Sequence, residues 1–60
     1  MFDDYDVWAT ASLLLKGWPA RAREGVEALI QENLHSGNFA RALMWQEVAA
    51  AMGVLAAKSN

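Results

Sequence analysis

The apolar positions recur at helical spacing in three stretches of the chain, and glycines separate the stretches. Side chains three and four residues apart lie on one face of an α-helix, because the helix completes a turn in about 3.6 residues. Apolar side chains follow this spacing in residues 4–16, 19–36 and 39–57. Gly17 and Gly37 come directly after the first two stretches, where glycine commonly ends a helix. The pattern therefore predicts an all-α protein with three helices.

The beginning of the first helix is indicated by its polar residues. Asp3 is suited to cap this helix, and Phe2 and Val7 have the spacing of a hydrophobic staple. Asp4 and Asp6 place carboxylates at the positive end of the helix dipole, which stabilises them there. The apolar face that follows consists of Val7, Trp8, Ala11, Leu14 and Leu15.

The second helix is expected to begin at Pro19, because proline lacks the N–H that has no partner at a first helical position. Arg21 and Arg23 follow at the unfavourable end of the helix dipole, and they either contact an anion or partner or pair with glutamates one turn further on. Gly25 indicates the close approach of another element or an exposed position without a packing role. The apolar stripe consists of Ala22, Val26, Leu29, Ile30 and Leu34.

The third helix is apolar on two opposite sides. Gly37 suits the left-handed end of the second helix, and Asn38 is a good cap for the third. Between residues 39 and 57 only Arg41, Gln46 and Glu47 are polar. One apolar side consists of Met44, Trp45, Val48, Met52 and Leu55. The other consists of Phe39, Leu43, Ala50, Val54 and Ala57.

A helix that is apolar on both sides is normally buried on both sides. The fold is expected to be one domain, residues 1–60, arranged as a three-helix bundle or an open three-helix array. Two companion helices are expected to cover one side of the third helix and to leave the other uncovered. We therefore predict a homo-oligomer, most simply a two-fold dimer, joined through that side. The predicted self-association residues are Phe39, Leu43, Ala50, Val54 and Ala57.

Two alternatives to this prediction stay open. The first two helices could wrap the third more fully, or Gly53 could end the third helix early. Ala49, Gly53 and Ala57 recur every four residues, so another backbone could approach closely along that line.

The expected core lies at the centres of the apolar faces and consists of Trp8, Leu15, Val26, Ile30, Trp45 and Val48.

Composition supports the helical prediction and bounds the function. Twelve alanines and seven leucines stand against six β-branched residues, which favours helix. The net charge of −2 provides no basic surface for nucleic acid, and the absence of cysteine excludes disulfides and thiolate metal sites. A 60-residue chain buries only about 60% of its unfolded surface. Its stability therefore depends on dense packing or on self-association.

No targeting or membrane segment is expected. The N-terminus carries Asp3 and Asp4 where a signal peptide would be basic, and the apolar run Val48–Ala57 is half as long as the roughly 20 residues that span a bilayer. A peripheral membrane helix is usually rich in basic residues, whereas the third helix carries only Arg41. We expect a cytoplasmic protein.

The candidate chemistry is sparse. His35 has only Glu32 as a possible second metal ligand, and a zinc site needs three or four. Asp3, Asp4 and Asp6 lack the glycine and terminal glutamate of a calcium loop, and their positions suit helix capping. We expect no metal, no cofactor and no catalysis.

Two segments resemble a known family. Asp6–Ala11 (DVWATA) and Trp45–Ala49 (WQEVA) are similar to the two ends of a family of short, uncharacterised helical bacterial proteins, a domain of unknown function. That family shows Asp-x-Trp-Ala-x-Ala near its start and Trp-x-x-Ile/Val-x-x-Ala near its end, with a glycine-containing turn between. The resemblance covers about residues 6–55 and rests on ordinary packing residues. It implies no activity and no site residues.

Two functional hypotheses follow. The first is a small, non-enzymatic protein-interaction module that acts by self-association or by binding a protein partner. The alternative is a small nucleic-acid-associated regulator in which the second and third helices form a helix-turn-helix pair. Arg41 is the only basic residue in its recognition helix before Lys58, so nucleic acid is not the expected partner.

Overall fold

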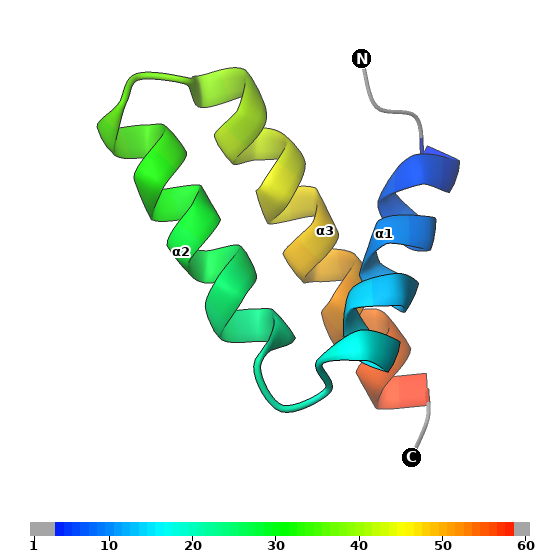
Figure 1. The fold of residues 1–60 in the computed structure, drawn as a ribbon. Helices are drawn as coiled ribbons and strands as arrows, with labels where there is room; N and C mark the ends of the chain where they lie inside the picture. The colour runs from blue at the N-terminus through cyan, green and yellow to red at the C-terminus, as the bar shows by residue number, and fades with distance from the viewer. Residues whose placement is uncertain (1–3, 59–60) are drawn as a thin grey trace.

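The structure, a computed structural model, describes residues 4–58, and these residues fold into three α-helices (Figure 1). Helix α1 spans Asp4–Gly17, α2 spans Ala22–His35 and α3 spans Phe39–Lys58. No strand forms in this part of the chain. The predicted all-α, three-helix fold is confirmed.

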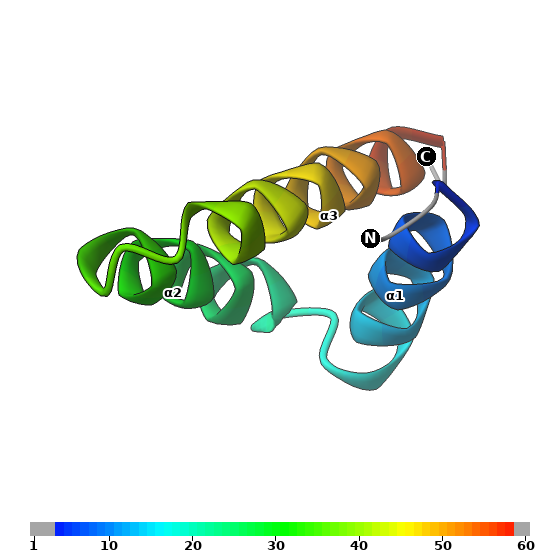
Figure 2. The ribbon, with the colours of Figure 1, turned by 90° about the horizontal axis from the view of Figure 1, so that it is seen from above.

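Helix α3 is the central helix of the bundle. It packs against both α1 and α2, whereas α1 and α2 make few contacts with each other. Figure 2 shows this arrangement from above, with α1 and α2 diverging on one side of α3. The molecule accordingly extends 36 × 24 × 16 Å along its three principal axes, so it is flattened and not cylindrical. The third helix thus has two neighbours, which leave part of its circumference open.

The end of α1 agrees with the prediction to within one residue. The helix ends at Gly17, and the Trp18 N–H donates a 2.9 Å hydrogen bond to the Leu14 carbonyl. Lys16 lies in the last turn, where the negative end of the helix dipole favours a cation. The predicted Asp3 cap and the Phe2 side of the hydrophobic staple lie outside the described residues.

The prediction that α2 begins at Pro19 is wrong by three residues. The Trp18 carbonyl accepts hydrogen bonds from the N–H groups of Arg21 (3.1 Å) and Ala22 (2.8 Å), so Pro19 lies inside a turn that precedes the helix. Arg21 occupies the position just before the helix and makes no side-chain cap. Proline suits the second residue of a four-residue turn as well as the first residue of a helix, because both have the backbone φ that its ring imposes.

The connection between α2 and α3 confirms both predicted caps. Gly37 has a φ of 82°, the left-handed conformation that favours glycine. Its N–H donates to the Leu34 carbonyl (3.2 Å), and the Asn38 N–H donates to the Asn33 carbonyl (2.8 Å), which is the Schellman pattern. The Asn38 Oδ1 then accepts the Arg41 N–H at 3.3 Å. The chain therefore reverses within three residues and sets α2 alongside α3 in the opposite direction (Figure 1).

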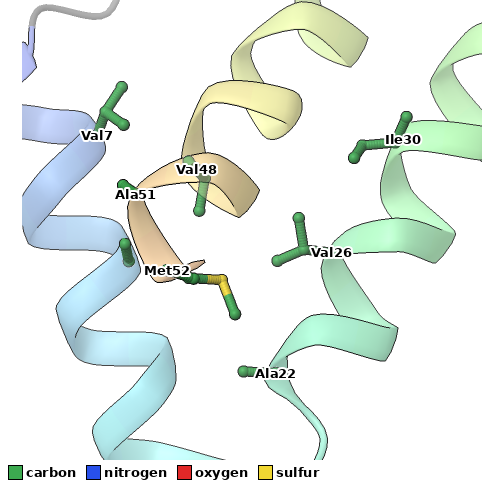
Figure 3. Packing of buried hydrophobic residues seen from close by; sticks show 8 residues of the cluster. Val7, Ala22, Val26, Ile30, Val48, Ala51 and Met52 are labelled. Carbon is green, nitrogen blue, oxygen red and sulfur yellow. The ribbon is translucent and has the colours of Figure 1, made fainter. Parts of the chain in front are cut away.

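The core is built mainly from small side chains. Figure 3 shows Val26 and Ile30 of α2 pointing towards Val48 and Met52 of α3, and Val7 of α1 lying beside Ala51. Val26, Val48 and the longer Met52 are almost completely buried. The buried residues are Val7, Ala11, Ala22, Val26, Ile30, Ala42, Val48, Ala51 and Met52.

The predicted core is only partly correct. Val26, Ile30 and Val48 are buried as expected, while Leu15 and Trp45 are partly buried and pack against the core from its edge. The prediction for Trp8 is wrong, since 42% of its surface is exposed. Trp8 lies about 100° around the helix from buried Val7. It therefore projects from the flank of α1, where small residues already fill the contact with α3.

Alanines were the core residues that the sequence pattern missed. Ala42 and Ala51 are almost completely buried on α3, although neither belongs to the two apolar sides defined from the sequence. An alanine is found both in cores and on helix surfaces, so periodicity alone gives it little weight. The sequence feature that indicates the burial of Ala42 and Ala51 is their small size, because a small side chain on a central helix lets a neighbouring helix approach closely.

Candidate interaction surfaces

The outer face of α3 is apolar and exposed. We use this name for Phe39, Leu43, Ala50, Val54 and Ala57, the residues predicted to mediate self-association. The exposed fractions of the three larger side chains are 67% for Phe39, 58% for Leu43 and 44% for Val54, and both alanines are exposed as well. The predicted division of α3 into a covered side and an uncovered side is therefore present in the structure.

The covered part of α3 takes up about half of its circumference. It runs from Ala51, which lies next to α1 in Figure 3, to Ala42, near the turn that joins α2. These residues are separated by about 180° on a helical wheel. Met44, Trp45 and Leu55 lie between them and pack against the core. Two neighbouring helices thus bury one half of α3, and the outer face lies on the other half, between the exposed residues Gln46 and Glu47.

A tryptophan of α1 extends the outer face sideways. Trp8 borders a shallow hollow of about 240 Å³ between α1 and α3, which also contains Ala50 and Val54 of the outer face. Glu47 is the charged residue among those that line the hollow. The remaining lining comes from Val7 and Ala51. The exposed indole of Trp8 is therefore continuous with the apolar surface of α3.

A second hollow lies between α1 and α2, and we call it the interhelix hollow. Its volume is about 220 Å³. Trp45 contributes from α3, Leu14 from the end of α1, and Trp18 and Arg21 from the connection between α1 and α2. The lining of α2 consists of Ala22, Gly25, Val26 and Leu29. The two hollows share no lining residue, and α3 borders both of them.

The line of small residues on α3 is partly occupied within the chain. Ala49 packs against the core, and the Arg23 Nη2 atom lies 3.5 Å from the position that a Cβ on Gly53 would take. The helix does not end at Gly53, since it continues to Lys58. The side of Gly53 that lacks a side chain faces Arg23 of α2. Of the three small residues, Ala57 is the exposed one. A second backbone could approach along this line only after Arg23 moved.

The titratable residues form no cluster suited to a metal ion. No group of three or more His, Cys, Asp and Glu side chains in the described part of the chain could hold one. His35 lies in the last turn of α2 and is exposed, and Glu32 is exposed one turn before it. Among residues 4–58, no buried side-chain nitrogen or oxygen lacks a hydrogen-bond partner.

None of the helices described is both long enough and apolar enough to cross a membrane.

In comparisons with known proteins, no family model, no curated protein and no solved structure matches the chain. The resemblance of the Trp8 and Trp45 segments to a family of small helical proteins therefore stays an expectation.

Proposed function

We propose that the chain is a small cytoplasmic protein-interaction module that acts by forming a homodimer through the outer face of α3. The observation that carries this proposal is the exposure of Phe39, Leu43 and Val54 along a single helix face. A helix of 20 residues is about 30 Å long, so these side chains form an extended apolar strip. Extended exposed apolar patches are typical of protein–protein contact sites.

The small size of the core supports self-association. The chain has no disulfide, and the buried residues in its described part include no leucine and no aromatic side chain. A domain of this size gains little free energy of folding from its own core, and oligomerisation is one of the ways in which small domains become stable. Burying Phe39, Leu43 and Trp8 in an interface would add three large side chains to the apolar surface removed from water.

A two-fold dimer would place the outer face against its own copy. In such an interface each residue patch contacts the same patch of the partner. The five residues would form the centre, while Trp8 and Glu47 would lie at the edge, beside the hollow of about 240 Å³. An apolar centre with a more polar rim is the usual composition of such interfaces.

Analytical ultracentrifugation at micromolar concentration tests the proposal. We expect a species of twice the 6.6 kDa chain mass that dissociates on dilution. Leu43→Glu and Val54→Glu each bring two like charges into a two-fold interface and should give monomers. Leu13→Glu is the matched control, because Leu13 is 69% exposed and lies about 140° around α1 from Trp8, the residue that borders the outer face; this variant should remain dimeric. A stable 6.6 kDa monomer for the wild-type chain would contradict the proposal.

The nucleic-acid alternative gains no support from the helix arrangement. The two helices of a helix-turn-helix cross at about 90–120°. In both views α2 and α3 lie side by side and run in opposite directions (Figures 1 and 2). Tight, salt-sensitive retention of labelled duplex DNA in a filter-binding assay at low salt would reverse this preference.

A further inference from the structure

The interhelix hollow has the size of a small-molecule site. Its volume of about 220 Å³ exceeds the roughly 150 Å³ of an engineered apolar cavity that binds benzene in another protein. Two indoles, those of Trp18 and Trp45, contribute to its walls together with Leu14 and Leu29. Trp18 is largely exposed, so the hollow is reached from solvent. One aromatic ring or a short alkyl chain would fit in it.

Gly25 keeps this hollow open. Glycine inside a helix costs about 1 kcal/mol relative to alanine. A Cβ built on Gly25 would meet nothing within 4 Å, and Gly37 is the described glycine with a positive φ. Neither a close contact nor the backbone conformation therefore requires glycine at position 25. Because Gly25 lines the hollow, a side chain at this position would take up part of its volume.

A charge at the mouth of the hollow selects the ligand class. Arg21 is the charged residue among the described residues that line it; the walls expose almost no polar atoms, so its aliphatic stem forms the wall and its exposed guanidinium lies at the mouth. A guanidinium presents paired N–H donors whose geometry matches a carboxylate. We propose that the interhelix hollow binds a small amphipathic carboxylate, with the apolar part between Trp18 and Trp45 and the carboxylate at Arg21. The site is separate from the outer face of α3 and goes beyond the proposed dimer.

Nuclear magnetic resonance of the three indole N–H groups tests this proposal. The probe is 4-phenylbutyrate, and the matched neutral compound is 4-phenylbutanol. Saturable shifts are expected for Trp18 and Trp45, whereas Trp8, which lines the other hollow, should keep its position. The alcohol should bind up to about fivefold more weakly, the range expected for a solvent-exposed charge pair.

Two variants separate the roles of shape and charge. Gly25→Leu should abolish the ligand-induced shifts by filling the hollow, and its thermal melt should show that the helix is at least as stable as in the wild type. Arg21→Gln should bind the carboxylate and the alcohol equally.

Several outcomes would overturn the proposal. They are an absence of saturable shifts, equal shifts of all three indoles, wild-type binding by Gly25→Leu, and tighter binding of the alcohol than of the carboxylate. Shifts of Trp18 and Trp45 that follow protein concentration without any ligand would also overturn it, because a second copy of the chain would then occupy the hollow.

Discussion

Val48 and Val54 lie six residues apart on the same helix, yet Val48 is completely buried and Val54 is 44% exposed. Six residues correspond to about 240° around an α-helix, so the two side chains project to different sides of α3. Val48 faces the side that α1 and α2 cover, and Val54 belongs to the outer face. The same residue type therefore serves two different purposes within less than two turns.

We expect Val48→Ala to lower the free energy of unfolding by about 2 kcal/mol, because it removes methyl groups from the closely packed centre of the bundle. Val54→Ala is the matched control, and it should change the stability of the monomer by less than about 0.5 kcal/mol. Urea denaturation at high dilution measures both. Equal effects of the two substitutions would show that α3 is oriented differently.

Trp45 of α3 and Trp8 of α1 should differ in their contribution to stability. Trp45→Ala should cost about 3 kcal/mol, because this side chain packs against the core. Trp8→Ala should cost about 1 kcal/mol in the monomer, since 42% of the surface of this residue is already exposed to solvent. Chemical denaturation monitored by circular dichroism measures the unfolding free energy of both variants. A larger loss for Trp8→Ala than for Trp45→Ala would show that Trp8 belongs to the core.

Two Gly→Ala substitutions should have opposite signs. Gly37→Ala should destabilise the chain by about 1 kcal/mol, because alanine is strained at a φ of 82°. Gly25→Ala should stabilise it by up to about 1 kcal/mol, because the added Cβ meets open space in a helix. Thermal melts of the two variants side by side provide the comparison. A loss of stability on Gly25→Ala would reveal a packing role for that glycine.

The cap at the start of α3 should be measurable. Asn38→Ala removes the side-chain oxygen that accepts the Arg41 N–H and should cost about 1 kcal/mol. Asn38→Asp keeps an acceptor and should retain wild-type stability or exceed it, since a carboxylate is favourable at the positive end of the helix dipole. If Asn38→Ala were neutral in urea denaturation, water would replace the hydrogen bond at no cost.

The three helices and their glycine breaks were predictable because local physics determines them. Gly37 and Asn38 act through their own backbone and side-chain hydrogen bonds, so their roles follow from residue type and position. The position of Pro19 was less certain, because its fixed φ suits both a turn and a first helical residue. The choice was made by the hydrogen bonds to the Trp18 carbonyl.

The surfaces were predictable only where one helix defines them. The outer face follows from the periodicity of α3 alone, and all five predicted residues are exposed. Trp8 was misplaced because its burial depends on how closely α1 approaches α3, which the periodicity of α1 does not contain. The interhelix hollow was not foreseen for the same reason, since residues from all three helices and a turn line it.

The scarcity of contacts between α1 and α2 has a consequence for how the chain folds and opens. Helices α2 and α3 are joined by a tight turn and are in direct contact, so they can assemble as a hairpin through interactions that are close in sequence. Helix α1 docks mainly on α3 and can leave with little disturbance of that hairpin. Native-state hydrogen exchange should therefore release the amides of α1 through a partial opening of lower free energy, while those of α2 and α3 exchange together.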